Sequence, residues 1–262
     1  MTFLTGMTAL ASGLAIGLVL GLVGGGGSIL AVPLLVYVVG VQSPHLAIGT
    51  AAAAVAFNAL AGLVTHVRAG NVRWPCGLVF AATGVAGAAL GAEAGKSFDG
   101  ERLLLLFGLL MIGVGSSMLR KRRRELDPNV RLTRENARQM LPRLSASGLL
   151  VGVLAGFFGI GGGFLIVPAL IFAAGLPIQL AIGTSLVVVA ALGATTAASY
   201  ALSGLVDWPL LGLLILGGAV GSGLGMRAGK WLLGKKRALE LGFASVVILV
   251  GAYVSAKAGG FA

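Results

Sequence analysis

Charged residues are scarce in this chain, and their scarcity excludes most soluble classes of protein. Only 10% of the 262 residues are charged, against about 25% in soluble globular proteins. Hydrophobic residues make up 57% of the chain, and the mean hydropathy is +1.01. This composition excludes an ordinary soluble enzyme, a disordered chain and a nucleic-acid-binding domain. It predicts a polytopic membrane protein.

Residues that build catalytic and metal sites are also few. One cysteine (Cys76) and two distant histidines (His45 and His66) cannot form a Cys-based zinc site or an H-E-x-x-H motif. The P-loop-like run at Gly91–Ser97 has the wrong glycine spacing. No deep carboxylate pair offers a proton or sodium site. Residues 1–8 lack Lys and Arg, so we expect no cleaved signal peptide. The sequence therefore predicts no enzyme activity, no cofactor and no metal.

Long apolar stretches fill most of the chain. A membrane-spanning helix needs about 20 apolar residues, and continuous runs of this kind favour helices over the alternating strands of a barrel. Two stretches, 3–40 and 144–175, are too long for one span and are interrupted by Gly24–Gly27 and Gly159–Gly163. The others lie near residues 46–67, 74–95, 103–119, 180–202, 208–230 and 238–256. The predicted fold is an all-α polytopic membrane protein.

The two halves of the chain resemble each other. Gly21–Pro33 aligns with Gly156–Pro168 at an offset of 135, and Ala47–Thr50 aligns with Ala181–Thr184 at an offset of 134. The dipeptide Trp74-Pro75 matches Trp208-Pro209 at the same offset. Matched Gly, Pro and Trp residues at one spacing indicate an internal duplication. We expect a first transmembrane repeat at 1–119, a basic linker at 120–143 and a second repeat at 144–262.

The positions of the basic residues distinguish two topologies, because Lys and Arg favour cytoplasmic loops. If each interrupted stretch returns to its own side as a hairpin, the halves are inverted and 16 of the 19 basic residues share one side. If each stretch crosses once, the halves are parallel and only 12 do so. The sequence favours inverted repeats, each with a Gly-broken helical hairpin plus three transmembrane helices. The linker is then cytoplasmic and the N-terminus lies outside.

The glycine runs are candidates for a binding site. Glycine costs about 1 kcal/mol relative to alanine inside a helix, so four in succession should break it. A helix that starts after the break exposes N–H groups and a positive dipole end, which bind anions. Close helix packing is the alternative role, and for these two clusters we favour a substrate-lining break. The candidate backbone donors belong to Gly25, Gly26, Gly27, Ser28, Gly161, Gly162 and Gly163.

Four polar side chains complete the candidate site. Thr50, Thr184 and Ser185 follow predicted helix starts, where a hydroxyl donates to an oxyanion or caps the helix. Asn58 lies mid-span, where an amide faces a cavity or bonds to a neighbouring helix. The sequence leaves both alternatives open for each residue. We expect all four to contribute to substrate binding.

At these residues the sequence resembles the sulfite exporter TauE/SafE family of bacterial membrane transporters. The similarity lies in the duplicated Gly-rich segments ending in Val-Pro, the paired Ala-Ile-Gly-Thr and the Trp-Pro pair. The resemblance implies transport of small sulfur-containing anions, such as sulfite, sulfonates and sulfoacetate, across the inner membrane. The first repeat has Gly25 where the second has Ile160, and Ser28 where the second has Gly163, so the two sides of the site need not be equivalent.

These features together predict a multi-pass secondary transporter of the inner (plasma) membrane, specific for a small sulfur-containing oxyanion or organosulfonate and working by alternating access. A passive anion channel and a cation-coupled importer of another small organic anion remain alternatives. The expected partners are the anionic substrate and a lipid bilayer, with anionic lipid at the basic linker and no nucleic acid. A homodimer is left open.

Overall fold

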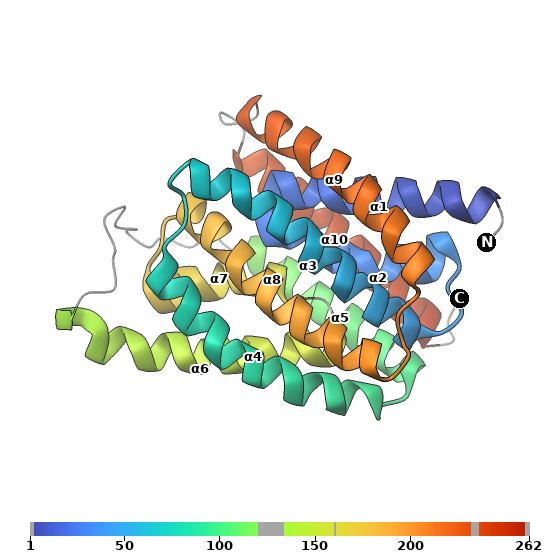
Figure 1. The fold of residues 1–262 in the computed structure, drawn as a ribbon, viewed down its shortest axis with the longest axis horizontal. Helices are drawn as coiled ribbons and strands as arrows, with labels where there is room; N and C mark the ends of the chain where they lie inside the picture. The colour runs from blue at the N-terminus through green and yellow to red at the C-terminus, as the bar shows by residue number, and fades with distance from the viewer. Residues whose placement is uncertain (1–2, 120–133, 160, 232–235, 260–262) are drawn as a thin grey trace.

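Helices account for nearly all of the chain that the computed structural model describes, which is residues 3–119, 134–159, 161–231 and 236–259 (Figure 1). Within this part, eight helices are long and apolar enough to cross a membrane. This confirms the prediction of a polytopic all-α protein. The eight are α1 (Phe3–Val23), α3 (Pro44–Arg68), α4 (Trp74–Lys96), α5 (Gly100–Leu119), α6 (Arg134–Phe158), α8 (Ile178–Leu202), α9 (Trp208–Trp231) and α10 (Lys236–Ala258).

Shorter elements lie at the two glycine runs. After α1 the chain continues as a 3₁₀ helix η1 (Gly24–Leu30), a single α-helical turn α2 (Ala31–Pro33) and a π-helix η2 (Leu34–Val39). After α6 it continues as helix α7 (Gly163–Ala174). Both short segments are apolar but below the length of a span.

Helix α6 begins earlier than the sequence indicates. The apolar stretch starts at Leu144, whereas the helix starts at Arg134 and contains Pro142 in its interior. The residues between 134 and 141 are mostly good helix formers, so the chain is helical before it becomes apolar. The predicted linker at 120–143 is therefore helical from Arg134, and residues 120–133 lie outside the described residues.

Three helices begin with a side-chain cap at the same end of the molecule. Ser43 Oγ accepts the N–H of Leu46 at the start of α3 (3.4 Å). The carboxylates of Asp99 and Asp207 accept N–H groups at the starts of α5 and α9, each at 3.0 Å. A carboxylate at this position also opposes the positive end of the helix dipole. These caps fix the short turns at this end.

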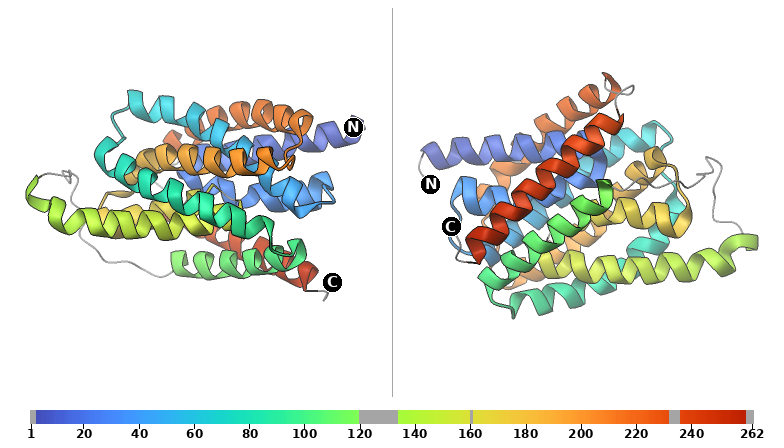
Figure 2. Two further views of the ribbon diagram at one scale, coloured as in Figure 1. Left: turned by 60° about the horizontal axis from the view of Figure 1, so that its bottom comes forward. Right: turned by 180° about the vertical axis from the view of Figure 1, so that it is seen from behind.

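Two pairs of helices from different halves pack in parallel through glycine. On α1 and α9, Gly13 faces Leu214 and Gly17 faces Gly218, so residue numbers rise together along the contact. Helices α4 and α6 pack in the same way, as Figure 2 shows. Added side chains would meet backbone atoms across both contacts, which is the close packing typical of small residues in membrane helices.

Two other pairs run antiparallel. At the centre of the bundle, Gly62 of α3 faces Leu186 of α8, while Gly193 faces Ala56, so numbers rise on one helix as they fall on the other. Helices α5 and α10 lie side by side on the back of the bundle and are also antiparallel (Figure 2). Because α3 and α5 align in sequence with α8 and α10, helices that match in sequence run in opposite directions.

Basic residues concentrate at one end of the bundle, which we call the basic end. The described residues there include Arg68 and Arg73, which flank the α3–α4 turn, and Arg143 and Arg227 on α6 and α9. Lys96, Arg102 and Lys257 lie at the other end, where α1 begins and α10 ends (Figure 1). For the described residues, this partition is the one that the hairpin topology predicts.

Candidate functional site

The first glycine run folds the chain back onto α1. A Cβ atom added at Gly27 would lie 2.8 Å from the carbonyl oxygen of Ile16 and would also contact the backbone of Leu20. Residues seven and eleven positions apart cannot approach so closely along a straight helix. The chain therefore reverses through η1, as the hairpin hypothesis requires.

The second glycine run reverses α6 at the equivalent residues but with a different backbone. A Cβ atom at Gly162 would lie 2.8 Å from Ala155 Cβ and 3.6 Å from Val151 Cγ1, the same seven- and eleven-residue separations. Gly159, Gly161 and Gly162 have φ values of +66°, +62° and +68°. An L-residue with a side chain pays roughly 1–2 kcal/mol in this left-handed region, which explains why the turn uses glycine.

The second turn lies between the two central helices. A Cβ atom at Gly161 would be 3.2 Å from Val55 Cγ1 of α3 and 3.7 Å from Val189 Cγ1 and Gly193 Cα of α8. Segment η1 contacts both α7 and α8. The two turns therefore meet beside the middle of the α3–α8 pair, and residues 26–29 and 161–164 are buried there.

Buried polar residues in the described part of the chain are all neutral. They are Ser12, Ser28, Thr50, Asn58, Thr184, Ser185, Thr196 and Ser222. Among the described residues, no group of three His, Cys, Asp or Glu side chains could hold a metal ion. An anion inside this bundle would thus be bound by backbone N–H groups and neutral side chains.

Thr50 and Thr184 lie at opposite ends of the bundle. Thr50 Oγ1 accepts the N–H of Asp207 (3.0 Å), and Thr184 Oγ1 accepts the N–H of Arg73 (2.9 Å). Because Leu186 is level with Gly62 on the antiparallel helix, about 14 residues, or about 20 Å, separate the two threonines along the axis. The structure therefore does not bring these two predicted site residues together. Their oxygens instead attach the turns before α4 and α9 to the central helices.

The other predicted side chains are also buried, with different surroundings. Ser185 Oγ donates to the carbonyl of Ile182 (2.8 Å) within its own helix, so its proton is engaged there. Asn58 is 1% exposed and lies against Gly218, and its Nδ2 has no hydrogen-bond partner within the described structure. Ser28 is fully buried in η1. Of the four predicted side chains, Asn58 alone combines mid-span burial with an unpartnered donor.

Ser12 is a polar residue that the sequence reasoning missed. It lies on α1, is 2% exposed, and its hydroxyl has no hydrogen-bond partner in the part of the chain that the structure describes. Thr196 on α8 is fully buried with the same property. A lone hydroxyl in an apolar stretch is the available sequence signal, but serine is common in such stretches and the signal is weak.

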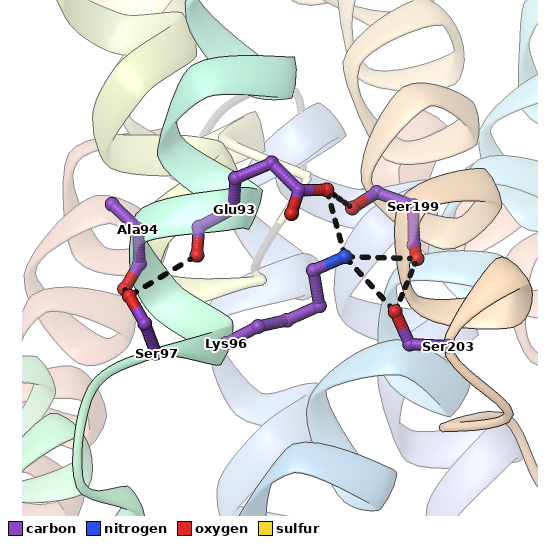
Figure 3. A network of polar contacts seen from close by, with 6 residues as sticks. All are labelled: Glu93, Ala94, Lys96, Ser97, Ser199 and Ser203. Atoms are coloured by element: carbon purple, nitrogen blue, oxygen red, sulfur yellow. Dashed lines mark hydrogen bonds and ion pairs between the residues drawn. The ribbon is translucent and has the colours of Figure 1, made fainter.

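A polar cluster joins α4 to α8 at the end opposite the basic end (Figure 3). Lys96 Nζ lies 2.7 Å from Glu93 Oε1 and donates to Ser203 Oγ (3.0 Å) and to the carbonyl of Ser199 (3.3 Å). Ser199 Oγ donates to the same Glu93 oxygen (2.8 Å). The sequence signal was the Glu–Lys pair at i, i+3. The cluster holds the ends of the two helices together.

Comparison with known proteins places the chain in a family. The chain matches the sulfite exporter TauE/SafE family over residues 9–254. A probable membrane transporter protein of Xylella fastidiosa (strain 9a5c) is 48% identical over 254 residues, covering 97% of this chain and 96% of that protein. The probable membrane transporter protein YunE of Bacillus subtilis is 28% identical over 256 residues, covering 91% and 93%. No solved structure matches. The chain belongs to the sulfite exporter TauE/SafE family and is a membrane transporter rather than an enzyme.

Proposed function

We propose that this transporter moves a small sulfur-containing oxyanion or organosulfonate, such as sulfite or sulfoacetate, across the bacterial inner membrane. The observation that carries the proposal is the position of Gly161, between Val55 and Val189 at the middle of the central helices. Two chain reversals that meet inside a span region offer backbone donors where side chains offer no fixed positive charge. The family name supports a sulfur anion as the substrate class.

The second turn offers the better anion donors in this conformation. The N–H groups of Leu165 and Ile166 already donate to the carbonyl of Gly162. We assign the N–H groups of Gly163 and Phe164, at the positive end of α7, to the substrate. Segment η1 is a 3₁₀ helix, in which N–H groups donate to carbonyl groups three residues earlier. We therefore expect the N–H groups of Gly25, Gly26 and Gly27 to be less available to a substrate than those of the second turn.

Transport by alternating access is the second part of the proposal. We propose that residues 1–119 and 144–262 are inverted repeats, because α3 and α5 run antiparallel to α8 and α10, the helices they match in sequence. Related halves of opposite orientation permit inward- and outward-facing states of similar energy. The basic end, with the linker, then faces the cytoplasm by the positive-inside rule and contacts anionic lipid.

The test is anion flux through the purified protein in proteoliposomes. Gly161→Ala adds one methyl group at a positive φ, 3.2 Å from Val55. We expect it to lower sulfite flux at least tenfold, because it displaces the turn that carries the donors. Gly113→Ala is the matched control, since a Cβ atom there meets nothing within 4 Å. Unchanged flux in a folded Gly161→Ala protein would reject this site.

Two other mechanisms share the same structural features. A passive anion channel would give flux that neither saturates nor shows counterflow, whereas a transporter shows both. A cation-coupled importer would require a proton or sodium gradient, and backbone carbonyls at the two turns could bind sodium. Measuring counterflow and gradient dependence in the same vesicles separates the three mechanisms.

A further inference from the structure

An open groove lies between α3 and α9 at the basic end. Its volume is about 440 Å³, and its walls include Thr65 of α3 and Val220, Leu224 and Arg227 of α9. Gly223 forms the floor, since a Cβ atom added there meets nothing within 4 Å. The central site lies at the α3–α8 pair, so this groove is a separate feature.

At the other end of the bundle, the equivalent residues form the polar cluster of Figure 3. At the offset of 134, Thr65 corresponds to Ser199 and Arg227 to Glu93. There, Glu93 Oε1 accepts the hydroxyl proton of Ser199 (2.8 Å) and pairs with Lys96 (2.7 Å). At the basic end a guanidinium replaces the carboxylate, so a hydroxyl and a cation line the groove and none of its described lining residues is acidic.

We propose that this groove binds one anionic phospholipid, with its phosphate on Arg227 and Thr65 and an acyl chain along Val220 and Leu224. The phosphate oxygens take the role that the Glu93 carboxylate has at the other end: they accept from a hydroxyl and pair with a cation. Guanidinium binds phosphate through two parallel hydrogen bonds, which favours arginine at such a site.

The walls of the groove favour a lipid over a small hydrated anion. Val220 is 58% exposed and Leu224 is 46% exposed, and both face the outside of the bundle. An acyl chain covers such side chains, whereas a free anion leaves them bare. Lys96 and Glu93 form an ion pair at the other end, whereas Arg227 has no carboxylate partner among the described residues. Arg68, at the end of α3, adds positive charge at the same level.

Native mass spectrometry of the purified full-length chain, titrated with phosphatidylglycerol or phosphatidylcholine, tests whether binding depends on the negative charge of the lipid headgroup. We expect one phosphatidylglycerol to bind more tightly than phosphatidylcholine, and Arg227→Gln to reduce that preference about fivefold or more. Arg102→Gln removes a basic side chain at the other end and should leave the preference unchanged. If Arg227→Gln does not fold, Arg227→Lys keeps the charge without the paired hydrogen bonds, and its preference should lie below wild type.

A second pair of variants tests the groove itself without altering charge. Gly223→Leu fills the floor and should also weaken phosphatidylglycerol binding severalfold. Gly212→Leu, on the same helix and likewise in open space, should not. Equal binding of the two lipids, or equal binding by wild type, Arg227→Gln and Gly223→Leu, would overturn the proposal. So would displacement of the lipid by millimolar sulfite, which would assign the site to a small anion.

Discussion

The backbone N–H of Arg73 donates to Thr184 Oγ1 at 2.9 Å, across 111 residues of sequence. At the opposite end of the bundle, the N–H of Asp207 donates to Thr50 Oγ1 at 3.0 Å. Both threonines are fully buried. Each bond ties the turn before one helix to the side of another, and so fixes the start of α4 or α9 relative to the central pair.

Removing either hydroxyl should destabilise the protein without changing its substrate. Thr184→Val leaves the N–H of Arg73 without this acceptor, which costs about 1–3 kcal/mol. Thermal unfolding in detergent should show a lower midpoint for Thr184→Val and Thr50→Val, while Thr184→Ser stays close to wild type. Loss of sulfite affinity in Thr184→Val at unchanged stability would instead indicate that this residue contacts the substrate.

The glycine contact between α1 and α9 should tolerate no side chain. A Cβ atom at Gly17 would meet the backbone of Gly218, which cannot move aside as a flexible side chain can. We expect Gly17→Leu to cost more than about 3 kcal/mol, the upper end of ordinary overpacking. The loss of stability in Gly17→Leu can be measured as a lower thermal unfolding midpoint in detergent and as a loss of monodispersity. Gly113→Leu should behave like wild type, because that position faces open space.

Reporter fusions should place the two ends of the described chain on the same side of the membrane. Helix α1 begins, and α10 ends, opposite the basic end (Figure 1). The positive-inside rule puts that side outside the cell. Alkaline phosphatase fused after α10 should therefore be active, and a fluorescent protein inserted in the linker should fluoresce. An active phosphatase in the linker would reverse the assigned orientation.

The polar cluster of Figure 3 should restrain the end of α8. Lys96→Met removes the ion pair with Glu93 and the bonds to Ser199 and Ser203. The Glu93 side chain is 68% exposed, so water screens the pair and its contribution to stability is small. Amide hydrogen exchange at residues 199–203 should still rise measurably in Lys96→Met, and high salt should raise it in wild type. Arg102→Met is the control, and exchange equal to wild type in Lys96→Met would show that the cluster does not restrain α8.

The length and continuity of the apolar stretches were sufficient to predict the helical fold. The glycine runs at 24–27 and 159–163 predicted breaks in the helices, and the distribution of basic residues favoured hairpins over single crossings at these breaks. The start of α6 was not predicted, because residues 134–141 are helical but mostly polar. Membrane segments are recognised by hydropathy, and hydropathy does not register a polar helical extension.

The separation of two predicted site residues has a geometric reason. Thr50 and Thr184 occupy equivalent positions in the aligned halves, and their equivalence suggested a shared site. In an antiparallel pair, however, equivalent positions come together only near the middle of the helices, where Gly161 lies between Val55 and Val189. Thr50 and Thr184 each lie near the start of their own helix, so about 14 residues separate them along the axis. The direction of α3 relative to α8 determines how far apart the two threonines lie. The positions of the hydroxyl residues in the sequence do not reveal that direction.

The two chain reversals differ in backbone although they match in position. Gly159, Gly161 and Gly162 adopt positive φ, whereas their counterparts Gly24, Gly26 and Gly27 lie in a 3₁₀ helix. Glycine occupies every one of these six positions, and it is the residue that adopts both conformations at similar backbone cost. Each reversal can therefore take the shape of the other. In the proposed alternating-access cycle, an exchange of backbone conformation between the two turns would accompany the change from one facing state to the other.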